Sequence, residues 1–188
     1  MAATEEDKRK IQISKIEAAK RQLDCAIDLW FRGKDEVSIH TLLVASHRVI
    51  YDINKKHGTL HEAVYDTPVI KEEYKKEWVK MIAEPSNFFK HADRDPEGQI
   101  EFYPVINTMF MLHAVTGLAS LKEPPSVLLR ILSIWLFVHE PRFLSPVGLE
   151  FFKRGIPDTE VAHLRPLSKQ EFLETMLKVA ADHEAGRI

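Results

Sequence analysis

The stretch "AAKRQLDCAIDLWFRGKDEVSIHTLLVASHRVIYDI", residues 18 to 53, decides the fold class of this chain. On each side of Gly33, apolar residues recur at the spacing that places side chains on one face of an α-helix. Gly33 is a natural helix end, and Asp35 is a good N-cap for a helix that ends at Gly58. The pattern therefore predicts two helices joined by a short turn, the first beginning at about Glu5. The two apolar stripes consist of Ile13, Ile16, Leu23, Ile27 and Trp30, and of Leu42, Leu43, Ser46, Val49, Ile50 and Ile53.

The rest of the chain repeats helical spacing between prolines and caps, and no run alternates as a β-strand does. We predict an all-α helical bundle of roughly six to eight helices. It forms a single domain over residues 1–188, with a core over about 1–121 and additional C-terminal helices over about 122–188. The further predicted helices begin at Thr67–Pro68, at Ser86 after a break at Pro85, at Tyr103–Pro104, at Pro124–Pro125, at Ser145–Pro146 and at the capping box Ser168–Glu171.

The composition is typical of a globular protein, with 45% hydrophobic and 29% charged residues. A formal net charge of -2 gives no broad attraction to nucleic acid, although local basic patches are compatible with it. The longest apolar run, residues 126–139, is interrupted by Arg130 and is too short to span a membrane. The polar N-terminus lacks the apolar segment of a signal peptide, so we predict a cytoplasmic protein. The one cysteine, Cys25, is expected to be a small buried filler.

The most unusual polar segment is "EPSNFFKHADRDPEG", residues 84 to 98. Asn87 and His91 are four residues apart, so they would share a face if this segment is helical. Lys90 and Arg94 would form a second such pair. The two phenylalanines at 88 and 89 would anchor the segment to the bundle. The plainer interpretation is a short amphipathic helix whose acidic end makes a solvated turn.

Within this segment, "SNFFKH" resembles the Arg-Asn-x-x-x-His motif of the HEPN superfamily, a group of α-helical proteins that includes many ribonucleases. Asn87 and His91 match the motif, and Ser86 stands where the family has arginine. Residues 18 to 53 also look like the first helix pair of such proteins, in which small residues such as Ala45 and Ser46 let the helices pack closely. The resemblance covers residues 15 to 95 and makes residues 1–121 a HEPN-like core.

This resemblance implies a protein that binds or cleaves RNA or a nucleotide, without a cofactor and as a homodimer. His91 would be a general acid or base, because its ordinary pKa lies near neutral pH, and Asn87 would orient it or the phosphate. Lys90, Arg94 or Arg48 would contact the RNA backbone in place of the family's arginine. The groove around His91 is expected to be basic.

Two other classes of function stay open. A metal-dependent hydrolase would bind a divalent transition metal between helices, and imidazole and carboxylate ligands suit zinc, iron or manganese. The candidate metal ligands are His40, His47, His91, Asp93 and His113, of which His113 also fits a buried, hydrogen-bonded core histidine. An interaction or scaffold protein would have no pocket beside His91.

His139, followed by Glu140, is expected to be a cation near a helix C-terminus.

Overall fold

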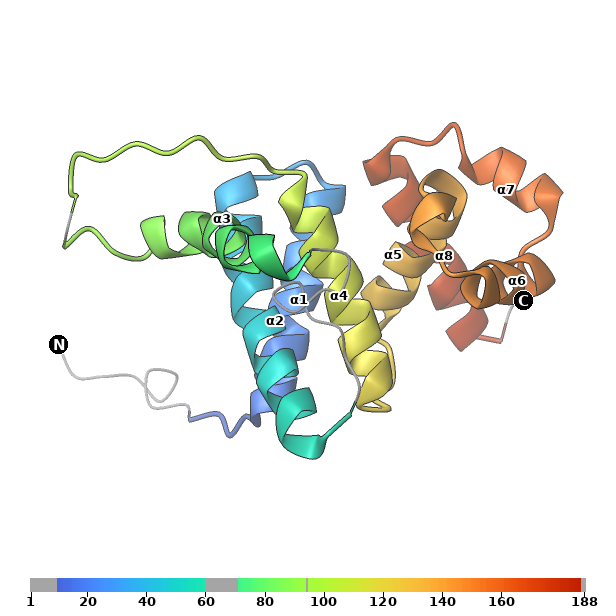
Figure 1. Cartoon of the computed structure of the whole chain (residues 1–188). Coiled ribbons are helices and arrows are strands. Elements are labelled where there is room, and N and C mark those ends of the chain that lie inside the picture. Colours follow the sequence, from blue (N-terminus) through green and yellow to red (C-terminus); the bar gives the residue numbers. More distant parts are fainter. Residues whose placement is uncertain (1–9, 60–70, 94, 187–188) are drawn as a thin grey trace, which may run out of the picture.

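The computed structural model describes residues 10–59, 71–93 and 95–186. All regular structure in these ranges is helical, as predicted, with eight α-helices and two short 3-10 turns (Figure 1). The α-helices are α1 (Lys15–Phe31), α2 (Glu36–His57), α3 (Lys75–Phe88), α4 (Ile106–Ser120), α5 (Val127–His139), α6 (Pro146–Gly155), α7 (Asp158–Leu164) and α8 (Lys169–Glu184).

The first two helices form the predicted antiparallel pair. Asp35 caps α2, because its carboxylate accepts the Ser38 backbone N–H at 2.7 Å, and Gly58 ends α2 at a φ of 66°. The predicted start of the first helix near Glu5 is wrong, since residues 10–14 are not helical. Ser14 forms a capping box with Glu17 and fixes the true start, by satisfying the first free backbone N–H groups.

Helix α4 runs alongside α2 in the same direction (Figure 1). Two buried polar side chains fix how closely the first, second and fourth helices approach. The Ser46 hydroxyl donates to the Ala19 carbonyl of α1 at 2.8 Å, and the Asn54 amide donates to the Gly117 carbonyl of α4 at 3.0 Å. Ser46 is thus one of the small interhelical contacts that the sequence indicated.

Helix α3 crosses α2 and α4 in Figure 1 and continues through Pro85 to Phe88, so the predicted break at Pro85 is wrong. Proline removes one backbone N–H from a helix, but its ring here is buried and its carbonyl accepts the Phe89 N–H at 2.9 Å. Ser86 is likewise buried inside α3 and does not cap a new helix. The predicted start at Thr67–Pro68 lies outside the described residues.

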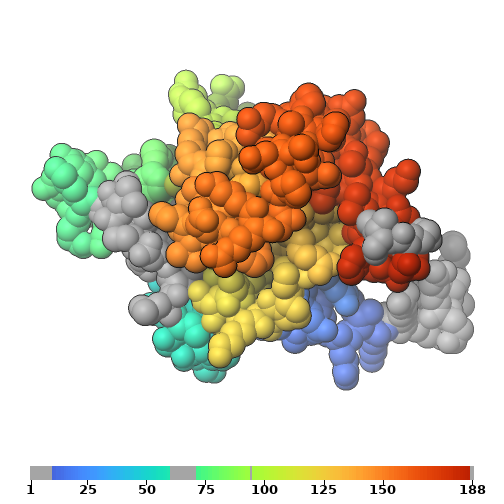
Figure 2. Space-filling view, turned by 90° about the vertical axis from the view of Figure 1, so that its right-hand side faces the viewer, coloured from blue at the N-terminus to red at the C-terminus, as the bar shows by residue number. Residues whose placement is uncertain are grey.

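The C-terminal helices surround α5, and Figure 2 shows them covering much of one face of the molecule. An aromatic cluster joins three helices here, because Phe172 of α8 lies 5.0 Å from Trp135 of α5 and 6.2 Å from Phe31 of α1 between ring centroids. The same buried core continues from α1 to α8. Nowhere in the part of the chain that the structure describes is a helix long and apolar enough to cross a membrane.

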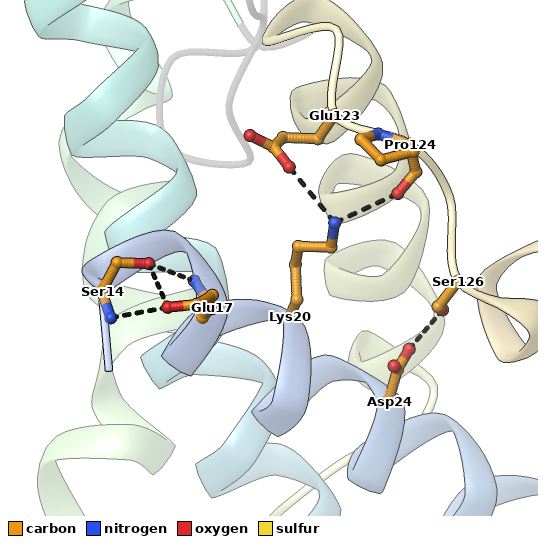
Figure 3. A network of polar contacts seen from close by, with 7 residues as sticks. All are labelled: Ser14, Glu17, Lys20, Asp24, Glu123, Pro124 and Ser126. Carbon is orange, nitrogen blue, oxygen red and sulfur yellow. Dashed lines mark hydrogen bonds and ion pairs between the residues drawn. The ribbon is translucent and has the colours of Figure 1, made fainter. Parts of the chain in front are cut away.

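The segment between α4 and α5 is tied to α1 by polar contacts (Figure 3). The Lys20 ammonium donates to the Glu123 carboxylate and to the Pro124 carbonyl, each at 3.2 Å. Ser126 caps α5, and its hydroxyl donates a hydrogen bond to the Asp24 carboxylate. Burial raises the pKa of Asp24. One residue on α1 differs from expectation: Cys25 is exposed, because it points away from the apolar stripe.

Candidate functional site

One face of α3 and of the turn that follows it carries four polar residues, at positions 80, 84, 87 and 91. Their spacing of four, three and four residues keeps them in one line along a helix. They line a surface hollow of about 640 Å³, which we call the α3 hollow, together with Ala83, Phe88, Asp93 and Asp95. The polar line consists of Lys80, Glu84, Asn87 and His91.

Asn87 and His91 stay neighbours although α3 formally ends at Phe88. The His91 backbone N–H donates to the Asn87 carbonyl at 3.2 Å, so the helical path continues for one more turn. Both side chains are exposed and line the same hollow. A small molecule or a strand of chain can therefore reach both at once.

The charge of the α3 hollow differs from the expected basic groove. The carboxylates of Glu84, Asp93 and Asp95 face one ammonium group, that of Lys80, among the described residues that line it. A polyanion is therefore not drawn into this hollow by charge alone. Carboxylates accept hydrogen bonds from hydroxyl and amino groups, so the hollow suits the hydroxyl-rich or amino-bearing part of a ligand.

Neither of the two predicted backbone-binding cations within the described residues lines the α3 hollow. Lys90 does not line the α3 hollow, and Arg94 lies outside the described residues. Arg48 is on α2, where its guanidinium pairs with Asp52 at 3.1 Å. Ser86, at the position of the family's arginine, is 4% exposed, so a side chain at this position is directed into the bundle rather than into the hollow.

The five candidate metal ligands separate into two places. His91 and Asp93 line the exposed α3 hollow, whereas His40 and His47 are fully buried on α2. Phe110 of α4 packs against both buried rings, with centroid distances of 5.5 Å to His40 and 5.2 Å to His47. His113 is half-buried, and its ring centroid lies 6.3 Å from that of His47. Within residues 10–59, 71–93 and 95–186, no group of three or more His, Cys, Asp or Glu side chains is arranged to hold a metal ion.

His40 instead belongs to a buried hydrogen-bond chain that the sequence did not reveal. Its Nδ1 donates to Asn107 Oδ1 at 2.9 Å, and Asn107 Nδ2 donates to the Glu36 carboxylate at 2.9 Å. Because the Asn107 oxygen can only accept, the proton of the neutral His40 ring lies on Nδ1. Burial lowers the pKa of His40, the nearby charge of Lys90 lowers it further, and the Asn107 hydrogen bond opposes both.

The other side of the His40 ring is enclosed by aromatic side chains. Its centroid lies 5.9 Å from Phe89 and 5.1 Å from Phe102, in edge-to-face arrangements. His40 Nε2 is buried and has no hydrogen-bond partner in the described part of the chain. Phe89 thus packs the segment after α3 against the bundle, as expected, whereas Phe88 lines the α3 hollow.

Sequence reasoning missed Lys80, Glu84 and Asp95 as residues of this hollow. The signal was present, since Lys80 and Glu84 precede Asn87 by seven and three residues and thus share its face of a helix. It was lost because the helix was assumed to break at Pro85. Comparison with known proteins finds no family model, no curated protein and no solved structure that matches this chain.

Proposed function

We propose that this protein is a HEPN-like helical protein that binds RNA or a nucleotide in the α3 hollow and cleaves RNA there without a metal ion. The observation that supports this proposal is that Asn87 and His91, the two matching residues of the motif, line one hollow together with Lys80. The close antiparallel packing of α1 and α2, with Ser46 at the contact, supports the same family resemblance.

The proposed reaction uses the ribose of the substrate as its nucleophile. His91 accepts the proton of the 2′-hydroxyl, whose oxygen then forms a bond to the adjacent phosphorus. The bond from phosphorus to the 5′-oxygen breaks, this leaving oxygen takes a proton from water, and the resulting hydroxide removes the proton from His91. The products are a 2′,3′-cyclic phosphate and a free 5′-hydroxyl. No redox change and no further reactant is needed.

Each polar side chain of the hollow has a role in this scheme. Lys80 offsets the negative charge that grows on the phosphate oxygens, which is the role of arginine in the family motif. Asn87 holds the phosphate or the imidazole by a hydrogen bond. The carboxylates of Glu84, Asp93 and Asp95 accept hydrogen bonds from ribose hydroxyls and base amino groups. Binding thus rests on one nucleotide rather than on many phosphates.

We also propose that the protein is a homodimer whose interface adjoins the α3 hollow. A groove of about 640 Å³ runs beside it and has Glu84 in common with it. Its wall includes exposed apolar side chains, with Met81 at 53% and Tyr103 at 69% exposure. Exposed apolar groups gathered in this way are typical of surfaces that associate.

The proposal is tested by incubating mixed-sequence RNA with the purified protein in EDTA, beside His91→Ala and the control His183→Ala. His183 is exposed on α8, far along the chain from the hollow. We expect cleavage by the wild type and by the control, with cyclic phosphate ends, and a loss of at least about a hundredfold in His91→Ala. Cleavage by all three proteins alike, or by none of them, would contradict the proposed reaction.

A further inference from the structure

A second hollow lies where α1, α2, α5 and α8 meet the beginning of α4, and we call it the Trp–Lys hollow. Its volume is about 420 Å³, within the range of small-molecule sites. None of its residues lines the α3 hollow. The side chains on which its chemistry depends are Trp30, Glu36, Trp135, His139, Glu140 and Lys169.

Lys169 is the unusual group of this hollow. Its ammonium lies 3.6 Å from the centroid of the Trp30 ring, a close cation–π contact. The side chain is half-buried and forms no ion pair with any described residue. Burial lowers the pKa of Lys169, while the charge of Glu36 acts in the opposite direction. Glu36 lines the same hollow without forming an ion pair with Lys169, so the half-buried ammonium can still take an incoming anion as its direct partner.

His139 forms part of the aromatic wall of this hollow. Its ring stacks on Trp135 with centroids 3.7 Å apart, and its Nε2 is buried with no hydrogen-bond partner among the described residues. Burial and the charge of Arg165 lower the pKa of His139, although Glu140 opposes them. His139 was expected to be a cation at this helix end. Because its ring packs into the aromatic cluster, it is instead mainly neutral at neutral pH.

The two carboxylates that line the hollow are already engaged. Glu36 accepts the Asn107 amide at 2.9 Å, and Glu140 pairs with the Arg142 guanidinium at 3.0 Å. The polar group left for a ligand is thus the Lys169 ammonium, which is set among indole rings. An ionised acid with a flat apolar body would satisfy the cation and pack against the aromatic wall.

We propose that the Trp–Lys hollow binds a small aromatic carboxylate, whose carboxylate accepts hydrogen bonds from Lys169 and whose ring packs against Trp30 and Trp135. This site is separate from the α3 hollow, and its occupation does not depend on RNA cleavage. Its volume accommodates a one- or two-ring acid.

The test follows the indole N–H signals of the full chain by ¹⁵N NMR during titration with benzoate and, separately, with benzamide. The chain has three tryptophans, of which Trp30 and Trp135 line this hollow and Trp78 does not. We expect benzoate to shift the two signals of Trp30 and Trp135 with saturation, and to leave that of Trp78 in place. Benzamide, which is isosteric but uncharged, should bind at least about tenfold more weakly, since a charged hydrogen bond is lost.

Three variants assign the effect to the ammonium. Lys169→Met should weaken benzoate binding about tenfold, and Lys169→Arg, which keeps the charge, should bind within about threefold of the wild type. Lys178→Met, on an exposed position of the same helix, should bind as the wild type does. If Lys169→Met does not fold, the comparison of benzoate with benzamide on the wild type decides alone.

The proposal is overturned if no saturable shift occurs, if benzamide binds as well as benzoate, or if Lys178→Met loses as much affinity as Lys169→Met. Equal competition by inorganic phosphate would also overturn it, because the site would then recognise charge without the aromatic ring.

Discussion

Asn107 is the residue that holds together a polar network between α2 and α4. It joins His40 of α2 to the Glu36 carboxylate, and it is itself fully buried on α4. Its removal leaves the fully buried His40 without its hydrogen bond and takes one donor from the half-buried Glu36 carboxylate. Such groups are costly because they have lost water without gaining a replacement.

We predict that Asn107→Leu lowers the free energy of unfolding by about 2–4 kcal/mol, because His40 and Glu36 each lose a hydrogen bond. The measurement is urea unfolding followed by far-UV circular dichroism. The double variant His40→Phe with Asn107→Leu should recover part of the loss, because both partners are then apolar. An unchanged urea midpoint in Asn107→Leu would show that the network adds nothing to stability.

A second prediction concerns pH and the buried histidines. Burial lowers the pKa of both His40 and His139 below the ordinary value of 6.5. The unfolded chain therefore binds more protons than the folded chain as the pH falls through and below 6.5, so stability is full above this value and is lost as the pH falls. We expect the melting temperature to fall between pH 7.5 and pH 5.

His139→Phe keeps the stack on Trp135 and removes the titrating group, so the fall in its melting temperature should be smaller. His183→Asn, at an exposed position, serves as the control and should follow the wild type. A fall of the same size in all three proteins would assign the pH dependence to other groups.

At the scale of the helices, three predicted caps are confirmed, whereas the one at Ser86 is not. The capping box Ser168–Glu171 and the caps at Asp35 and Ser145 all lie where the sequence indicated. A cap is a local arrangement, since the side chain bonds to a backbone N–H only three residues away. Helix α7 was not predicted, because its seven residues are too short to show a periodic pattern.

We predict that Ser168→Ala lowers the free energy of unfolding by about 1 kcal/mol, because the first turn of α8 loses its side-chain acceptor. Glu171→Gln should cost less, since glutamine also serves in a capping box. Urea unfolding of both variants makes the comparison. A larger loss in Glu171→Gln than in Ser168→Ala would contradict this account of the cap.

For the whole molecule, the proposed dimer is the property with the clearest test. Met81→Glu places a charge in the apolar groove beside the α3 hollow, and a buried, unpaired charge opposes association. We expect the variant to be monomeric in light scattering after size-exclusion chromatography, where the wild type is dimeric. Val147→Glu changes an equally apolar side chain, 80% exposed on α6, and should stay dimeric.

A monomeric wild type would contradict the proposed dimer outright. Dissociation by both variants would show that the groove beside the α3 hollow has no special part in association. RNA cleavage measured on the same samples separates loss of the dimer from damage to His91, because the variant leaves the hollow's polar line unchanged.

The sequence by itself determined the all-α class, both ends of α2, the starts of α6 and α8, and the shared face of Asn87 and His91. These follow from spacing along the chain and from caps, which act over three or four residues. Only the tertiary structure decided that α3 continues through Pro85, because burial of the proline ring sustains a helix that local propensity would end.

Tertiary structure also brought together groups that are distant in the sequence. The chain from His40 through Asn107 to Glu36, and the meeting of Lys169 with Trp30, depend on how α1, α2, α4 and α8 pack. No periodicity or motif encodes such contacts, since they arise from long-range burial of apolar faces. The acidic character of the α3 hollow has the same origin, because Asp93 and Asp95 return to it after α3 has ended.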